Sequence, residues 1–119
     1  MAFGIEAEGN IARYLHAGGY RVLGRRVRTR SGEVDVIAVR DDTVAFVEVK
    51  ARSRGYDGLE AVDGRKQARL SRAANEWLSR NDAYGQCTIR FDIALVWPKG
   101  GLEYLENAFE GSAPDDFVW

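Results

Sequence analysis

The sequence contains one cysteine, one histidine and two prolines among its 119 residues, and no apolar run reaches the length of a membrane span. A single cysteine, Cys87, excludes a disulfide bond within the chain and is typical of a reducing compartment. The single histidine, His16, has no partner at ligand spacing, which argues against a histidine-based metal site. The amino terminus lacks a charged segment followed by a long apolar one, so we expect a cytoplasmic protein without membrane association.

Net charge is also small, at −1, and this total predicts neither a nucleic-acid binder nor an acidic tail protein. The distribution is less even. Residues 1–81 contain fifteen Lys or Arg and eleven Asp or Glu, whereas residues 82–119 contain two and seven. Such a basic region can bind a polyanion on a protein of low pI, although ordinary solvated faces would give the same counts.

Two runs rich in β-branched residues, Val34–Val39 and Val44–Ala51, flank a polar segment and predict a β-hairpin. A loop centred on Asp41 and Asp42 would place four facing pairs on one side of the hairpin. The expected pairs are Val39 with Val44, Ile37 with Phe46, Asp35 with Glu48, and Glu33 with Lys50.

The facing carboxylates of Asp35 and Glu48 would repel each other at about 5 Å between their Cβ atoms. Apolar neighbours on the same face indicate that other parts of the protein cover this end. A divalent cation would neutralise the two carboxylates and use both as oxygen ligands, and Lys50 would share their charge. The alternative is a half-exposed strand with a surface Glu–Lys pair, which contributes little to stability.

Periodicity predicts an α+β protein of the order αβββαβ, with a central mixed β-sheet flanked by helices. We expect a single domain over residues 1–110, followed by an irregular tail over residues 111–119. The predicted elements are a helix at 5–17, a strand at 20–29, the hairpin, a helix at 63–80, a strand at 88–97 and a short edge strand at 102–105.

The apolar stripes of both predicted helices extend to polar residues. Glu8 falls on the buried face of the first helix, where a first-turn carboxylate that favours the helix dipole is the equal alternative. The stripe of the second helix meets Lys66 and Gln67 when it is extended back by one turn. Lys66 reaching to solvent and Gln67 capping locally are the alternatives there.

Seven segments follow one another along the chain: E-A-E-G-N-I-A-R-Y-L, G-Y-R-V-L-G-R-R-V-R, G-E-V-D-V-I-A, F-V-E-V-K-A-R, R-K-Q-A-R-L, R-F-D-I-A-L-V and N-A-F. In this order they resemble the YraN family of small bacterial proteins, which are related to archaeal Holliday-junction resolvases. Asp35 followed by Glu48-Val49-Lys50 is also similar to the D-(x)n-E-x-K signature of restriction-endonuclease-like nucleases. Arg26 departs from the family pattern, which usually has Asn there.

The resemblance implies a restriction-endonuclease-like core and a site that binds Mg²⁺ or Mn²⁺. It implies metal ligands at Asp35, Glu48, the Val49 carbonyl and Glu8. Lys50 would orient or deprotonate the attacking water, and Gln67 would support the site. Phosphate contacts are expected from four basic residues, which are Arg28, Arg52, Arg54 and Lys66.

These features together predict a Mg²⁺-dependent endonuclease that acts on DNA, with branched DNA among the candidate substrates. Chemistry on two strands would require a two-fold homodimer. The first alternative is a non-catalytic module that binds nucleic acid or a repair partner through the same fold. The second is an interaction protein in which the charged residues serve only structure.

Overall fold

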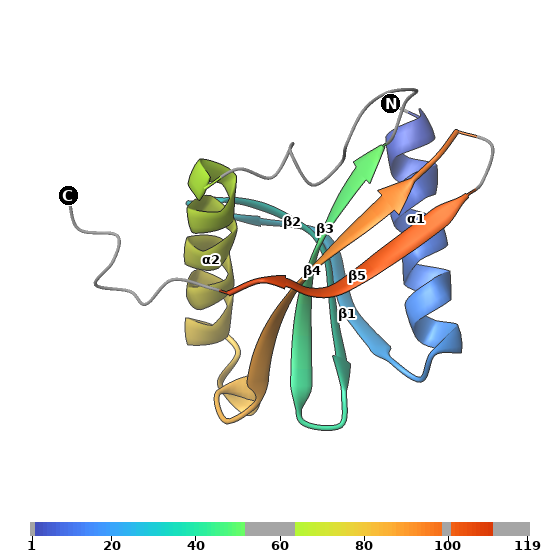
Figure 1. Cartoon of the computed structure of the whole chain (residues 1–119). Coiled ribbons are helices and arrows are strands. Elements are labelled where there is room, and N and C mark those ends of the chain that lie inside the picture. Colours follow the sequence, from blue (N-terminus) through green and yellow to red (C-terminus); the bar gives the residue numbers. More distant parts are fainter. Residues whose placement is uncertain (1, 52–63, 99–100, 111–119) are drawn as a thin grey trace.

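A computed structural model describes residues 2–51, 64–98 and 101–110, which form one sheet with a helix on each face (Figure 1). The predicted order αβββαβ is confirmed, and the expected edge strand extends further than predicted. The loop at 52–63 and the tail at 111–119 lie outside the described residues. The elements are α1 (Ala2–Ala17), β1 (Arg21–Thr29), β2 (Gly32–Arg40), β3 (Thr43–Ala51), α2 (Gly64–Ser79), a 3₁₀ turn (Asp82–Tyr84), β4 (Thr88–Val96) and β5 (Leu102–Phe109).

The sheet is mixed, with the strand order β1-β2-β3-β4-β5. Neighbouring strands are antiparallel except β3 and β4, which are parallel and are connected through α2. A parallel pair needs a long crossover connection, and a helix usually provides it. No described helix is long and apolar enough to cross a lipid bilayer.

Two cores hold the helices on opposite faces of the sheet. Ile11 and Leu15 of α1 pack on one face, and Leu70 and Ala73 of α2 pack on the other. Helix α1 ends as its glycines predict, because Gly19 adopts a φ of +91° and the Tyr20 N–H donates to the Leu15 carbonyl at 2.9 Å.

The hairpin turn is centred on Asp41 and Asp42 as predicted, and it has two residues because Arg40 pairs with Thr43; Asp41 has a φ of 53°. Its register is confirmed for Val39 with Val44 and for Ile37 with Phe46. The antiparallel ladder then ends at Val36 and Val47. The other two expected pairs, Asp35 with Glu48 and Glu33 with Lys50, are therefore not ladder pairs, and this part of the prediction is wrong.

The ladder ends where β2 changes the face that its side chains occupy. Val34 and Ile37 both pack in the core on the α2 side, whereas Val36 packs on the α1 side. Residues three apart in a regular strand point to opposite faces, so the alternation breaks between Val34 and Ile37. Asp35 and Glu33 turn toward α1 as a result, and the predicted common face of the hairpin is wrong for both residues.

Packing against α2 accounts for this break. The end of the β1–β2 hairpin bends away from β3 toward α2 (Figure 1). There the Arg30 N–H donates to Glu76 Oε2 at 2.8 Å. Gly32, with a φ of +144°, lies so close to α2 that an added Cβ would be 3.1 Å from Arg69 Cδ.

A buried ion pair holds β4 and β5 together at the edge of the sheet opposite β1. Asp92 on β4 is fully buried and accepts hydrogen bonds from the Arg90 guanidinium at 2.9 Å and from the Asn107 N–H at 2.9 Å. The Tyr104 hydroxyl donates to the same carboxylate. Asp92 therefore links β4 to β5 at the register shift between these strands.

We expect Asp92→Ala to lower the free energy of unfolding by about 3–5 kcal/mol, because it leaves a largely buried guanidinium without its carboxylate. Urea denaturation measures this change. Asp82→Ala, at an exposed position, is the control and should shift stability by less than about 0.5 kcal/mol. A loss at Asp92 as small as that of the control would contradict the structural role.

Candidate functional site

Three carboxylates gather where β2 parts from β3. Glu8 comes from α1, and Glu33 and Asp35 come from β2. Each offers an oxygen atom, and these oxygens all lie within 4.8 Å of one another. We call these three residues the acidic cluster. Each of the three residues is partly buried, so water screens their mutual repulsion only in part.

Asp35 is the centre of the acidic cluster. Its Oδ2 accepts a hydrogen bond from the Val49 N–H at 2.8 Å. Val49 lies beyond the last β2–β3 pair, so the carboxylate replaces the backbone carbonyl that a continued antiparallel ladder would offer to this N–H. Burial and the nearby charge of Glu48 raise the pKa of Asp35 to about 7, against the smaller opposing effect of the Val49 hydrogen bond. Asp35 therefore titrates near neutral pH, which is typical of functional carboxyl groups.

Glu8 lies beyond the first turn of α1, a turn that contains no acidic residue. Its side chain is 12% exposed, and its Oε1 is buried without a hydrogen-bond partner among the described residues. Burial raises the pKa of Glu8, whereas the Arg26 guanidinium acts in the opposite direction. The Arg26 Nε lies 3.8 Å from Glu8 Oε1, which is an ion-pair distance but too long for a hydrogen bond.

Basic side chains lie close to two further carboxylates, those of Glu33 and Glu48. Arg28 Nε lies 3.6 Å from Glu33 Oε2, and Lys50 Nζ lies 3.1 Å from Glu48 Oε2. Glu48 is not one of the three residues of the acidic cluster, but its charge is the strongest carboxylate influence on Asp35. Glu48 and Lys50 thus lie at the edge of the acidic cluster as a tight ion pair.

The structure places five of the ten predicted site residues at this end of the sheet. Glu8, Asp35 and Val49 meet there, and Glu48 with Lys50 lies beside them. The prediction did not include Glu33 among the ligands. The G-E-V-D spacing could have indicated it, because residues i and i+2 of a strand share a face.

The outcome differs among the remaining predicted residues. Gln67 and Lys66 are half-buried in the first turn of α2, which covers the opposite face from α1. Their place in the site stays a prediction. Arg28 is an exposed residue of β1 that pairs with the acidic cluster, whereas Arg52 and Arg54 fall outside the described residues.

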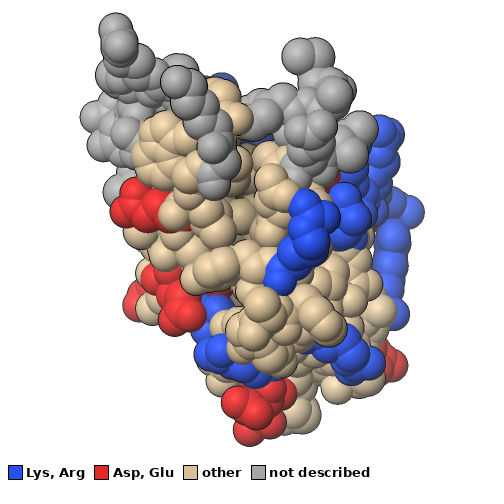
Figure 2. All heavy atoms as spheres, turned by 90° about the vertical axis from the view of Figure 1, so that its right-hand side faces the viewer, with Lys and Arg blue, Asp and Glu red and all other residues tan. Residues whose placement is uncertain are grey.

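Charge is divided across the face of the molecule that carries α1. Figure 2 shows the largest group of Lys and Arg side chains on the right of this face, and Asp and Glu on the left and at the bottom. The two edge strands differ in the same way, since β1 carries four arginines and β5 carries two glutamates. The basic strand β1 is the one that contributes Arg26 and Arg28 to the acidic cluster.

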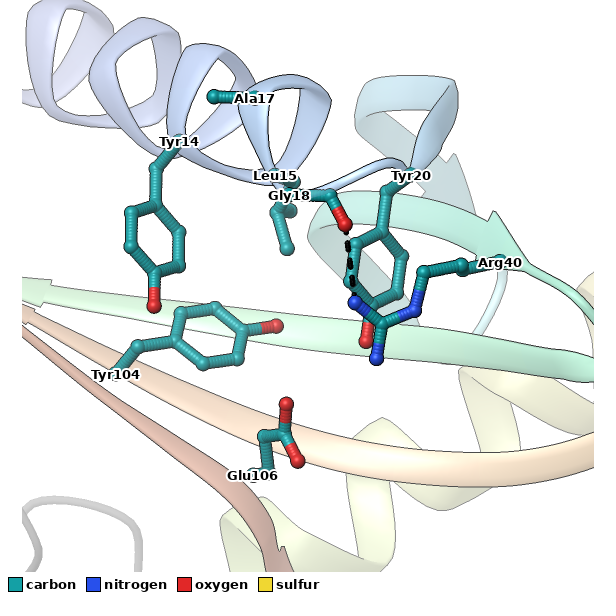
Figure 3. Close-up of a pocket in the computed structure, with 8 residues that line it drawn as sticks. All are labelled: Tyr14, Leu15, Ala17, Gly18, Tyr20, Arg40, Tyr104 and Glu106. Atoms are coloured by element: carbon teal, nitrogen blue, oxygen red, sulfur yellow. Dashed lines mark hydrogen bonds between the residues drawn. The ribbon is translucent and has the colours of Figure 1, made fainter.

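A separate pocket of about 320 Å³ lies at the carboxyl end of α1 (Figure 3). Arg40 crosses it, donating to the Gly18 carbonyl at 3.0 Å and lying 4.4 Å from the centre of the Tyr20 ring. Among its described lining residues, Glu106 is the one carboxylate, so the pocket lacks the paired acids of the cluster. The lining residues are Tyr14, Leu15, Ala17, Gly18, Tyr20, Arg40, Tyr104 and Glu106.

Comparison with known proteins identifies a family for the chain. Residues 7–96, which include the acidic cluster, match the model of a family described as uncharacterised protein family UPF0102. This match confirms the resemblance to the YraN family.

Individual relatives agree with this match. A UPF0102 protein of Rhodopseudomonas palustris strain CGA009 is 45% identical over 109 residues, which cover 92% of this chain and 84% of the relative. A UPF0102 protein of Mesorhizobium japonicum is 48% identical over 93 residues, which cover 78% and 74%. One of Methylorubrum extorquens strain PA1 is 45% identical over 107 residues, which cover 90% and 84%. These names state a family and no reaction.

The raised pKa of Asp35 predicts that stability falls with rising pH. Between about pH 4 and pH 7 the folded protein keeps a proton on Asp35 that the unfolded chain has lost, so the free energy of unfolding decreases as pH rises. We expect this contribution to reach on the order of 2 kcal/mol between about pH 5 and pH 8 without divalent cations. Urea denaturation at several pH values, with a chelator present, measures it.

Asp35→Asn should remove most of this pH dependence and make the variant more stable than the parent near pH 8. Asp42→Asn, in the exposed hairpin turn, should keep the slope of the parent. An Asp35→Asn variant with the same slope as the parent would show that Asp35 titrates normally.

Proposed function

This chain belongs to the UPF0102 family, and from that membership and its acidic cluster we propose that it is a divalent-cation-dependent endonuclease that hydrolyses phosphodiester bonds in DNA. One observation carries the proposal. Three carboxylates from a helix and a strand converge within 4.8 Å, and burial and the charge of Glu48 raise the pKa of one of them, Asp35, to about 7. A site that holds so many acids together without full solvation suits a divalent cation.

The donor set fits Mg²⁺ or Mn²⁺, which prefer oxygen ligands. Glu8 offers a buried oxygen without a hydrogen-bond partner among the described residues, and Glu33 and Asp35 offer further carboxylate oxygens. Glu48 and the Val49 carbonyl would complete the set. When bound, the cation would polarise the phosphate and lower the pKa of a water molecule.

The chain's own residues would do the rest. The Val49 N–H holds the Asp35 carboxylate in a fixed orientation. Lys50, whose side chain is 22% exposed and paired with Glu48, would orient the attacking water and offset charge on the phosphate. Gln67 would support this end of the site from α2.

Contacts to the substrate backbone would come from Arg28, Arg52, Arg54 and Lys66, and would give affinity without sequence preference. Branched DNA is a candidate substrate, and cutting two strands of it would require a homodimer.

A second candidate function rests on the ion pairs. Arg26, Arg28 and Lys50 each lie within 4.0 Å of a site carboxylate, so the protein partly neutralises the site without a metal. This favours a non-catalytic module that binds nucleic acid or a repair partner through the same fold. Cation binding separates the two candidates.

We expect Mn²⁺ or Mg²⁺ to raise the melting temperature of the parent, because a ligand that binds the folded state stabilises it by mass action. At a hundredfold excess over the dissociation constant the gain is about 2.7 kcal/mol. Thermal melting with increasing cation measures it. Asp35→Asn should lose the gain and Asp42→Asn should keep it, whereas equal stabilisation of all three proteins would remove the acidic cluster as the binding site.

With Mn²⁺ present, we expect cleavage of at least one substrate among labelled duplex, single-stranded, flap and four-way DNA. Lys50→Met should lower the rate by at least about a hundredfold, within the usual range for a group that assists proton transfer or stabilises charge. Arg80→Gln, which removes a surface charge just after α2, should cut as the parent does. Equal rates for Lys50→Met and the parent would assign the activity to a contaminant.

A further inference from the structure

Two arginines from different elements meet over one glycine of α1. A Cβ added to Gly9 would lie 3.5 Å from Arg25 Nη2 and 3.7 Å from Arg13 Nη1, so these two nitrogens are no more than about 7 Å apart. Gly9 is buried and both arginines are exposed. The missing side chain at position 9 therefore leaves room for two guanidinium groups against the helix.

The irregular part of β1 explains how Arg25 reaches this place. Consecutive residues of a strand normally point to opposite faces. Here Arg25 lies against Gly9 and Arg26 lies against Glu8, so both approach α1. Arg26 has a φ of 51°, a left-handed conformation that is uncommon for residues other than glycine. The strained backbone thus directs two adjacent positive charges to the same helix.

The two guanidinium groups make no close ion pair among the side chains that the structure describes, and the charge of Arg25 acts on Glu8 only at longer range. Neither Arg13 nor Arg25 has a carboxylate oxygen within 4.0 Å there. Arg13 instead donates a hydrogen bond to the Asn10 side-chain carbonyl, which fixes its direction. Like charges held this close are stabilised by an anion between them, and the guanidinium fork matches phosphate geometry.

We propose that Arg13 and Arg25 form a seat for a backbone phosphate of the nucleic acid, next to the phosphate that the acidic cluster would engage. This inference rests on the proposed function. Gly9 directly follows Glu8 in α1, so the seat and the acidic cluster would contact neighbouring phosphates of one DNA strand. This DNA strand would then run along the side of α1 next to β1, which is the basic edge of the sheet (Figure 2). The acidic strand β5 lies at the other edge.

Binding without cleavage tests the seat. Fluorescence anisotropy would follow a labelled DNA duplex and a labelled four-way junction, with a chelator present. We expect Arg13→Gln and Arg25→Gln each to raise the dissociation constant roughly fivefold and to lower the slope of its logarithm against log salt by about 1. Arg80→Gln removes the same charge from the exposed end of α2 and should bind as the parent does.

Two variants at position 9 test the geometry at constant charge. Gly9→Ala places its Cβ at ordinary contact distance from both arginines, so it should bind as the parent does. Gly9→Leu should displace both guanidinium groups and weaken binding as much as a double variant that combines Arg13→Gln and Arg25→Gln. Both arginine positions are exposed, so their variants keep the test valid if Gly9→Leu does not fold.

The seat is overturned if the parent shows no binding, if Arg13→Gln and Arg25→Gln bind as the parent does, or if Arg80→Gln weakens binding equally. Cleavage with Mn²⁺ is measured separately on the same proteins. Weakened binding in the arginine variants, together with a parent that cuts no substrate, would support the seat and overturn the nuclease. Cleavage by the parent, together with normal DNA binding by the arginine variants, would support the nuclease and overturn the seat.

Discussion

The hydrogen bond from the Val49 N–H to Asp35 Oδ2 is the interaction on which the rest of the site depends. The β2–β3 ladder ends at the pair Val36–Val47. Beyond this pair, the partly buried N–H of Val49 would otherwise lack an acceptor on β2. Leaving such a group unpaired costs about 1–3 kcal/mol. The carboxylate of Asp35 satisfies the N–H, so the feature that closes the split in the sheet also places Asp35 beside Glu8.

The carboxylates that meet at this split repel one another, and the protein offsets the repulsion in two ways. Burial and neighbouring acids hold the pKa of Asp35 near 7 and raise that of Glu8, which favours the neutral form of both groups. Arginines of β1 approach the acidic cluster, and one of them, Arg26, does so from a left-handed backbone conformation. Strain and unfavourable charge collected at one place are typical of functional sites, where the surrounding fold stabilises them. Asp92 is also a buried carboxylate, but it has a full set of partners and serves the β4–β5 connection.

The sequence predicted the parts of this arrangement that local patterns determine. Alternating apolar residues predicted the hairpin, the centre of its turn at Asp41 and Asp42 and its register as far as Ile37, and helical periodicity placed Glu8 on a buried face. It could not predict the change of face at Asp35, because that change arises where Val34 packs against α2, more than thirty residues away in the chain. The expectation of a facing Asp35–Glu48 pair assumed a straight strand, and it failed for this reason.

We propose that the split in the sheet builds a site for a divalent cation from the acidic cluster. Anomalous diffraction at the manganese edge, from crystals grown with Mn²⁺, would locate such a cation. We expect a strong peak among the carboxylate oxygens of Glu8, Glu33 and Asp35, with Glu48 nearby. A well-ordered acidic cluster without a peak, with Arg26 and Arg28 still paired to Glu8 and Glu33, would contradict it.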